Sequence, residues 1–286
     1  MRIAKVTPTE HDISLLPQGG KSDVTLSADG TLVRKVYNRN DDPVRKYWRE
    51  VGFYAHYGSS ELIPDLVESL PGEQAIVLAR APGVRCSDLQ LDSRSRHRLS
   101  ADHVDKVLQL LSIGGEVTRS TRRYYDDVGA SEYRDRVVAA LDSYRARTRQ
   151  AEDVVGRLSE SASQIAVTHE VLIKLDWNAS NVFVDGGLVK QFIDFEQAFI
   201  GTREMLTGIL LHNPFWCART VFAVLCRRGF FPGTTAEIVR YVDFALAAVV
   251  ADAFERNERP WSEHRLRAAY RRHVVERMAE LSAGSR

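Results

Sequence analysis

LDWNASNVFV, residues 175–184, and FIDFE, residues 192–196, carry the most informative pattern in this sequence. The first segment runs from a polar loop into an apolar strand, and an Asp-Gly-Gly turn at 185–187 leads back into a second apolar strand. This alternation predicts a β-hairpin. Asn181 enters its first strand and Asp194 leaves its second, so antiparallel pairing is expected to bring both residues to the same end.

Asp176 and Asn181 stand five positions apart, which is the spacing of the Asp and the Asn in the catalytic loop of kinases. In that loop the Asp accepts the proton of the substrate hydroxyl, and an Asn oxygen is a suitable ligand for Mg²⁺. Asp194 then stands where a second carboxylate ligand is required. In the competing interpretation these are two turn residues and a helix cap, which leaves the combined string unexplained.

The whole pattern resembles the aminoglycoside phosphotransferase and choline kinase-like enzymes. Their signature is a His-Gly-Asp loop, an Asn five residues after the Asp, and an Ile-Asp-Trp/Phe-Glu strand end. The close match covers residues 171–201. The resemblance implies that Asp176 is the catalytic base and that Asn181 and Asp194 hold Mg²⁺, which bridges the phosphates of ATP.

One departure from this family concerns the residues before Asp176, where Lys174-Leu175 replaces His-Gly. The family His is mainly a loop-supporting residue, so its replacement does not remove the chemistry. Lys174 is interpreted either as a residue that supports the loop, which is the favoured alternative, or as a cation that lowers the pKa of Asp176.

The remaining sequence predicts an α+β, two-lobed, protein-kinase-like fold. A small β-rich N-terminal nucleotide lobe at 1–80 is expected to precede a larger, mainly helical C-terminal lobe at 81–286, with the catalytic loop and acceptor site. The β-prone runs lie at 24–26, 31–37, 62–70 and 75–78, around one helix at 44–57. Helical periodicity begins near residue 100 and returns at 236–254 and 265–281.

Lys35 lies inside a predicted strand, and Glu50 follows fifteen residues later in the next helix. In kinases, a strand Lys paired with a helix Glu is directed towards the α and β phosphates. Arg34 is the competing cation, on the opposite face of the strand. Lys35 is preferred because the family pattern has a Lys followed by an apolar and an aromatic residue, here Val36-Tyr37. Taken alone, the pair is equally compatible with two unrelated exposed residues.

Two further parts of the nucleotide site are predicted from position alone. A phosphate-covering loop is expected between the first two strands, because Gly permits close backbone approach and free N–H groups bind phosphate. Its residues are Gly19, Gly20, Lys21 and Ser22. As the resemblance implies, the segment 76–80 is expected to be the hinge whose backbone binds adenine. Leu78 and Arg80 are the hinge residues assigned to nucleotide binding.

The chemistry predicted from these residues is ATP-dependent transfer of the γ-phosphate to a hydroxyl of a small molecule. No Asp-Phe-Gly or Ala-Pro-Glu follows the catalytic loop, which disfavours a protein kinase. The family makes an antibiotic, in resistance or self-protection, the first expected acceptor. A sugar, choline and homoserine remain alternatives, as does a catalytically inactive kinase-like nucleotide-binding protein.

A cationic aminoglycoside acceptor would favour an acidic cleft. The candidate acids are Asp126, Asp127, Glu196 and Glu204. The aromatic residues that would line an acceptor pocket are Tyr124, Tyr125, Phe215, Trp216 and Trp261, although packing in the core is their commoner role. The arginine-rich stretch 94–98 is expected to be solvated surface, with substrate or nucleic-acid contact the less favoured interpretation.

Composition and net charge limit the classes of protein and of binding partner that remain possible. The 286 residues carry a net charge of +1, which gives no global electrostatic reason to expect nucleic acid or a membrane as a partner. With 44% apolar and 27% charged residues, the chain is expected to be globular rather than disordered. Its three scattered Cys residues and the absence of an apolar leader favour a cytoplasmic protein. Either a monomer or a dimer is compatible with the sequence.

Overall fold

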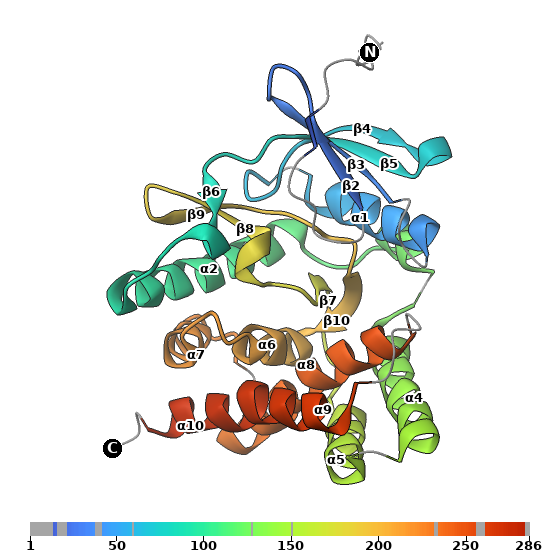
Figure 1. Ribbon diagram of the computed structural model, residues 1–286, viewed down its shortest axis with the longest axis vertical. Helices are drawn as coiled ribbons and strands as arrows, with labels where there is room; N and C mark the ends of the chain where they lie inside the picture. The colour runs from blue at the N-terminus through green and yellow to red at the C-terminus, as the bar shows by residue number, and fades with distance from the viewer. Residues whose placement is uncertain are drawn as a thin grey trace.

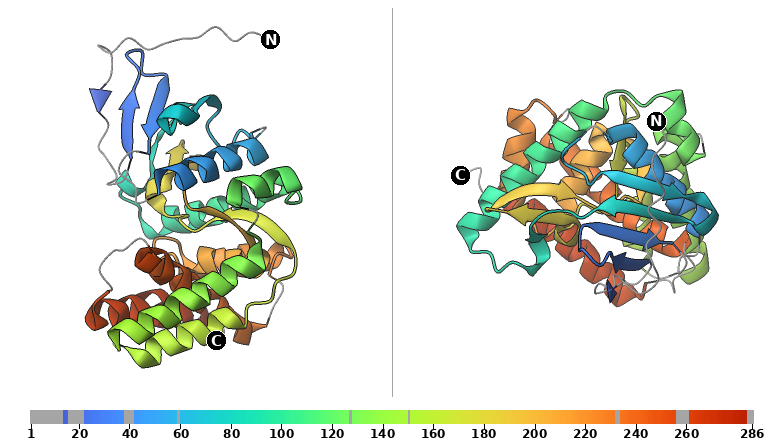
Figure 2. Two further views of the ribbon diagram at one scale, coloured as in Figure 1. Left: turned by 90° about the vertical axis from the view of Figure 1, so that its right-hand side faces the viewer. Right: turned by 90° about the horizontal axis from the view of Figure 1, so that it is seen from above.

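The computed structural model describes residues 14–15, 22–37, 42–58, 60–126, 128–149, 151–231, 234–255 and 261–283. Within these ranges the predicted α+β class is confirmed, because strands dominate the first part of the chain and helices most of the rest (Figure 1). Viewed from the side, the first sheet lies above the helical part (Figure 2).

The first sheet has, among the described residues, five strands in the order β1-β2-β3-β5-β4, and all neighbouring strands are antiparallel. The strands are β1 (Ser14–Leu15), β2 (Asp23–Leu26), β3 (Leu32–Val36), β4 (Leu66–Leu70) and β5 (Ala75–Ala79). Helix α1 (Pro43–Tyr57) lies between this sheet and the helical part (Figure 1). It begins one residue before the expected position 44, where the Asp42 carboxylate accepts a hydrogen bond from the Arg45 backbone N–H at 3.0 Å.

The helical part begins earlier than the periodicity predicts. Helix α2 (Ser93–Gly114) starts at Ser93 because Asp92 caps it, with the carboxylate accepting from the Ser95 backbone N–H at 2.7 Å. The other helices are α3 (Arg119–Arg122), α4 (Ala130–Thr148), α5 (Glu152–Ser163), α6 (Arg203–His212), α7 (Ala218–Arg227), α8 (Thr235–Glu255), α9 (Glu263–Tyr270) and α10 (Glu276–Ser282). A π-helical turn, Arg271–Val275, joins α9 to α10.

Two small sheets lie at the junction between the first sheet and the helices. One has the order β6-β8-β9, with β6 (Val84–Arg85), β8 (Val182–Asp185) and β9 (Leu188–Phe192). It contains the predicted hairpin. The other pairs β7 (Glu170–Lys174) with β10 (Ala198–Thr202), two strands that the sequence does not predict. Since β10 is buried along its whole length, it lacks the alternation that would have marked it.

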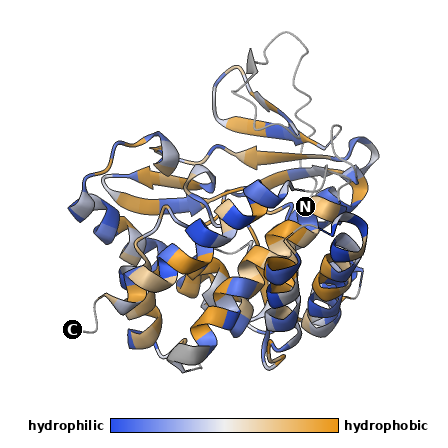
Figure 3. Ribbon diagram, turned by 60° about the horizontal axis from the view of Figure 1, so that its bottom comes forward, coloured by the Kyte–Doolittle hydropathy of each residue, from blue (hydrophilic) through white to orange (hydrophobic). Residues whose placement is uncertain are grey.

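A single apolar core runs through the described residues and joins α1, the small sheets and the C-terminal helices. The strands are largely hydrophobic, whereas the helices carry both kinds of residue (Figure 3). Within the described ranges, no helix combines the length and apolarity needed to span a bilayer. The division into lobes 1–80 and 81–286 stays a prediction; β5 and β6, which flank it, belong to different sheets.

Candidate active site

Two strand pairings frame the segment that carries the predicted catalytic residues. The pair β7–β10 closes one end of it and the pair β8–β9 closes the other. The nearest paired positions are Lys174 with Ala198, and Val182 with Phe192. The connecting segments 175–181 and 193–197 therefore lie opposite each other, held by main-chain pairing at both ends.

Additional backbone hydrogen bonds join these two segments. The Ile193 N–H donates to the Asn181 carbonyl at 3.0 Å, and the Leu175 N–H donates to the Gln197 carbonyl at 3.3 Å. The predicted hairpin geometry is thus present, with Asn181 directly beside the residue that precedes Asp194. Whether these side chains act in catalysis stays a prediction.

Asp176 and Asn181 contact each other directly. The Asn181 Nδ2 donates to the Asp176 Oδ2 at 2.9 Å. Because an ionised carboxylate only accepts, this bond directs the amide nitrogen of Asn181 towards Asp176 and leaves its Oδ1 for another partner. Burial raises the pKa of Asp176, while the nearby Lys174 ammonium and the bond from Asn181 act in the opposite direction.

Lys174 is fully buried beneath this loop. Its Nζ donates to the Ile193 carbonyl at 2.6 Å and to the Asp194 carbonyl at 3.1 Å. Burial lowers the pKa of Lys174 to about 8. The favoured interpretation, support of the loop, fits these contacts, and the charge of Lys174 also opposes the rise in the pKa of Asp176.

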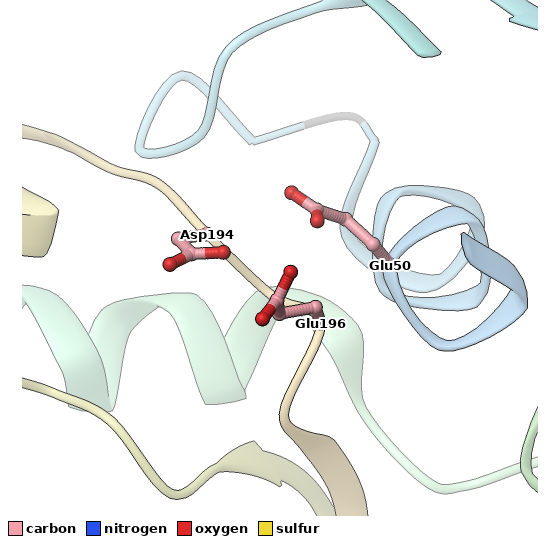
Figure 4. Close-up of side chains that lie close together, drawn as sticks. All are labelled: Glu50, Asp194 and Glu196. Carbon is pink, nitrogen blue, oxygen red and sulfur yellow. The ribbon is translucent and has the colours of Figure 1, made fainter. Parts of the chain in front are cut away.

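Lys35 lies among three carboxylates. Its Nζ is 2.7 Å from the Glu50 Oε2, 2.6 Å from the Asp194 Oδ1 and 3.3 Å from the Glu196 Oε2. Figure 4 shows Glu50 on α1 facing the other two acids on the segment after β9. The preference for Lys35 over Arg34 agrees with the geometry, since Arg34 instead pairs with Glu73 on the outer side.

These contacts shift the pKa values of the cluster. Burial disfavours the charge of Lys35, but Asp194, Glu50 and Glu196 outweigh burial and raise the pKa of Lys35 well above its usual range. Burial likewise raises the pKa of Glu50, which Lys35 offsets only in part. For Asp194, burial acts upwards, yet Lys35 and Lys174 hold its pKa below the usual range.

Glu196 and Lys46 belong to this site, although sequence reasoning gave neither of them a nucleotide-site role. The Glu196 Oε1 lies 3.7 Å from the Lys46 Nζ, and its Oε2 contacts Lys35. From the sequence, Glu196 is predicted only as a candidate acid for a cationic acceptor. The signal for it was present, because Glu196 ends the Ile-Asp-Phe-Glu string that contains Asp194.

The site offers two sets of side-chain oxygens to Mg²⁺. Carboxylate oxygens of Glu50, Asp194 and Glu196 lie within 4.8 Å of one another, but Lys35 already supplies their positive charge. The predicted pair, Asn181 Oδ1 and the Asp194 carboxylate, offers the hard oxygen ligands that Mg²⁺ prefers. The side chain of Asp194 is also 38% exposed, so it remains open to a ligand.

The predicted phosphate-covering loop lies only partly within the described residues, whereas both predicted hinge residues lie within them. Gly19, Gly20 and Lys21 lie outside the described residues. The Ser22 Oγ donates to the Glu196 Oε2 at 3.5 Å, which brings the end of that loop to the site. Leu78 is buried in β5, and the Arg80 backbone N–H donates to the Thr31 carbonyl at 2.9 Å.

A cavity of about 490 Å³ opens beside Asp176. Its walls come from α2, the loop 175–178, α6 and the loop after it, α8 and the π-helical turn. Of the predicted pocket aromatics, Phe215 lines it, whereas Trp216 is buried below and its Nε1 donates to the Trp177 carbonyl at 3.0 Å. The sequence did not point to Arg272 or His273, which also line it.

Comparison of the sequence with protein-family models and with curated proteins finds no match. Comparison with solved structures does. Macrolide 2'-phosphotransferase MphH from Brachybacterium faecium has a TM-score of 0.63 and 12% identity, over 96% of this chain and 93% of that one. ADP-bound aminoglycoside phosphotransferase APH(2'')-Ib has a TM-score of 0.61 and 19% identity, over 95% of this chain and 94% of that one. A thermostable mutant of aminoglycoside phosphotransferase APH(4)-Ia, in a ternary complex with AMP-PNP and hygromycin B, has a TM-score of 0.63 and 17% identity, over 91% of this chain and 93% of that one.

At these identities the likeness establishes the fold. It extends over nearly the whole length of each chain. The resemblance seen in the sequence and the predicted kinase-like fold class are therefore confirmed at the level of the fold. The chain therefore has the kinase-like fold of the aminoglycoside and macrolide phosphotransferases.

Proposed function

We propose that this protein transfers the γ-phosphoryl group of ATP to a hydroxyl of a small molecule that binds in the cavity beside Asp176. The observation that carries the proposal is the convergence of Asp176, Asn181, Asp194 and Lys35 on one place, through the two strand pairings and the contact with α1. Among the similar structures, one holds ADP and another holds AMP-PNP with hygromycin B.

In this proposal Asp176 orients the acceptor hydroxyl and takes its proton. The carboxylate lines the cavity, so an acceptor there reaches it directly. The hydrogen bonds from the Asn181 side chain and the Asn178 backbone fix the orientation of this carboxylate. A base with a pKa raised by burial accepts a proton more readily than an exposed Asp.

Lys35 would bind the α and β phosphates, with Glu50 and the Tyr37 hydroxyl fixing its position. The Tyr37 OH donates to the Glu50 Oε2 at 2.5 Å, the same oxygen that Lys35 contacts. Asn181 and Asp194 would hold Mg²⁺, which neutralises phosphate charge when bound. Backbone groups of the predicted hinge, residues 76–80, would meet the adenine, although the N–H groups of Ala79 and Arg80 already donate to the carbonyls of Asp65 and Thr31.

The test is ATP consumption by purified protein with Mg²⁺ against a panel of hydroxylated antibiotics and metabolites. Asp176→Asn is expected to lower turnover by about 10²- to 10⁴-fold and to leave ATP affinity nearly unchanged. Asp194→Asn is expected to weaken Mg²⁺-dependent ATP binding, measured by calorimetry. Asp185→Asn, at an exposed position in the hairpin, serves as the matched control.

Two outcomes would count against the assignment. Turnover of Asp176→Asn close to that of the wild type would remove the base from the mechanism. ATP affinity of Asp194→Asn that stays equal to that of Asp185→Asn would remove the proposed metal ligand.

A further inference from the structure

We infer that the acceptor carries an anionic group, a carboxylate or a phosphate ester, in addition to the hydroxyl that is phosphorylated. The inference rests on the proposed function, because it concerns the cavity beside the proposed base. The observation behind it is the charge of the cavity wall, which is opposite to what a cationic aminoglycoside would require.

Two arginines line the cavity, and both come from segments far from Asp176 in the sequence. Arg96 lies on α2 and its guanidinium is 5.9 Å from the centre of the Phe215 ring, which holds it over the cavity wall. Arg272 lies on the π-helical turn. Ion pairs nearby join Arg271 to Glu276 and Arg277 to Glu280, whereas within the described ranges neither cavity arginine has an ion-pair partner.

The π-helical turn explains how Arg272 reaches the cavity. In this turn the Glu276 N–H bonds to the Arg271 carbonyl five residues earlier, so one extra residue enters the helix. The helix is thereby rotated, and Arg272 and His273 face the cavity while Val274 is buried. Such turns cost helical regularity and occur frequently at functional sites.

Two histidines of the wall add hydrogen-bonding groups without adding charge. The rings of His212 and His273 stack with centroids 4.3 Å apart. Burial lowers the pKa of both, so both are neutral near pH 7. The His273 Nδ1 lies 3.2 Å from the His212 carbonyl and must donate to it, which leaves the His273 Nε2 as an acceptor.

Among the described residues that line the cavity, Asp176 is the single carboxylate. The acids considered for a cationic acceptor lie elsewhere: Asp126 lines a different cavity, Glu196 contacts Lys35 and Lys46, and Glu204 accepts from the Thr168 hydroxyl at 3.1 Å. Asp127 lies outside the described residues. Once Asp176 is committed to the hydroxyl, the described wall offers two unpaired guanidinium groups to the remainder of the acceptor.

Guanidinium groups bind carboxylates and phosphates through paired, charge-assisted hydrogen bonds. A polycationic ligand would bring its ammonium groups next to these arginines without a described carboxylate to receive them. The cavity volume of about 490 Å³ fits a small metabolite. The positive charge of the wall, its guanidinium donors and the cavity volume together favour a small hydroxy acid or a sugar phosphate as the acceptor.

The test measures binding rather than turnover, so that it stays independent of the proposed reaction. Glucose, glucosamine, glucuronate and glucose 6-phosphate form a matched set that differs mainly in charge. Calorimetry on the full chain is expected to give affinities for the two anionic sugars at least about 10-fold above that for glucose, with glucosamine the weakest. Tighter binding of glucuronate would indicate that the acceptor carries a carboxylate, and tighter binding of glucose 6-phosphate would indicate a phosphate ester.

Arg272→Gln is expected to lower the affinity for the anionic sugars by about 10- to 100-fold and that for glucose by less than about twofold. Arg271→Gln is the matched control, because Arg271 is the exposed neighbour outside the cavity. Equal affinities across the set, failure of both anionic sugars to bind at millimolar concentration, or an equal effect of the two substitutions would overturn the inference. Anion binding without ATP consumption would leave the inference standing and refute the proposed reaction.

Discussion

Replacement of Lys35 by Met tests the buried charge cluster, because it removes the cation and leaves the acids. Glu50 is the acid most affected, since its side chain is only 1% exposed and its hydrogen-bonded carboxylate oxygen would keep only the Tyr37 hydroxyl among the described contacts. Asp194 is 38% exposed and can regain water. Removal of one partner from a buried ion pair costs about 3–5 kcal/mol. We expect Lys35→Met to lower the free energy of unfolding by this amount at about pH 8.

The pH dependence gives this prediction its sign. Without Lys35, burial leaves the pKa of Glu50 in the folded variant above its ordinary value of 4.5. The folded variant then binds more protons than the unfolded chain in the window above pH 4.5, so its stability falls as the pH rises. The deficit against the wild type should therefore be largest near neutral and alkaline pH and shrink towards about pH 4.5.

Urea unfolding at several pH values measures both the loss of unfolding free energy and its dependence on pH. The double variant Lys35→Met/Glu50→Gln is the control, because it removes the uncompensated charge and should recover about 2–3 kcal/mol of the loss. A single variant within about 1 kcal/mol of the wild type at about pH 8 would refute the reasoning. A deficit that does not change with pH would show that lost packing, not charge, is the cause.

Three further predictions concern the loop and the helical core. Lys174→Met leaves two backbone carbonyls without their donor and should lower ATP turnover by about 10- to 100-fold, whereas Lys174→Gln should retain more activity because it keeps a donor. Since burial raises the pKa of Asp176, kcat/KM should fall on the acid side at a pH above the ordinary value of 3.8, and Lys174→Met should move that limb higher. Gly208→Ala should destabilise the fold by about 1–3 kcal/mol in urea unfolding, because the new Cβ would lie 1.7 Å from the Tyr241 carbonyl oxygen. Gly156→Ala should stabilise by up to about 1 kcal/mol, because the nearest atom to its new Cβ would be the Arg145 Nη1 at 4.0 Å.

The parts of the site that are local in sequence could be predicted from it. The hairpin follows from two apolar runs and a Gly turn, and its geometry then places Asn181 beside the segment of Asp194. Strand alternation places Lys35 and Arg34 on opposite faces, and Lys35 could be chosen because the family pattern has a Lys followed by an apolar and an aromatic residue, here Val36-Tyr37. The helix expected at 44–57 is present as α1, with the first helical position taken by Pro43.

The parts that depend on distant contacts could not be predicted. β7 finds its partner in β10 more than twenty residues later, and burial erases the alternation in β10 that would reveal it. Hydrophobic periodicity predicts the start of α2 too late because its first turns carry charged residues and no apolar stripe. A π-helical turn is one extra residue in a helix, which hydrophobic periodicity cannot report, so Arg272 had no signal at all.

The two strand pairings β7–β10 and β8–β9, which frame the loop, also determine which substitutions the site can tolerate. Ladder hydrogen bonds join backbone groups and do not depend on which side chains the strands carry. Residues around such a frame, including Lys174 and Leu175, can therefore be replaced while the carboxylates keep their relative positions. In this chain Asp176, Asn181 and Asp194 lie in such a frame, although its identity to solved structures of the same fold is only 12–19%.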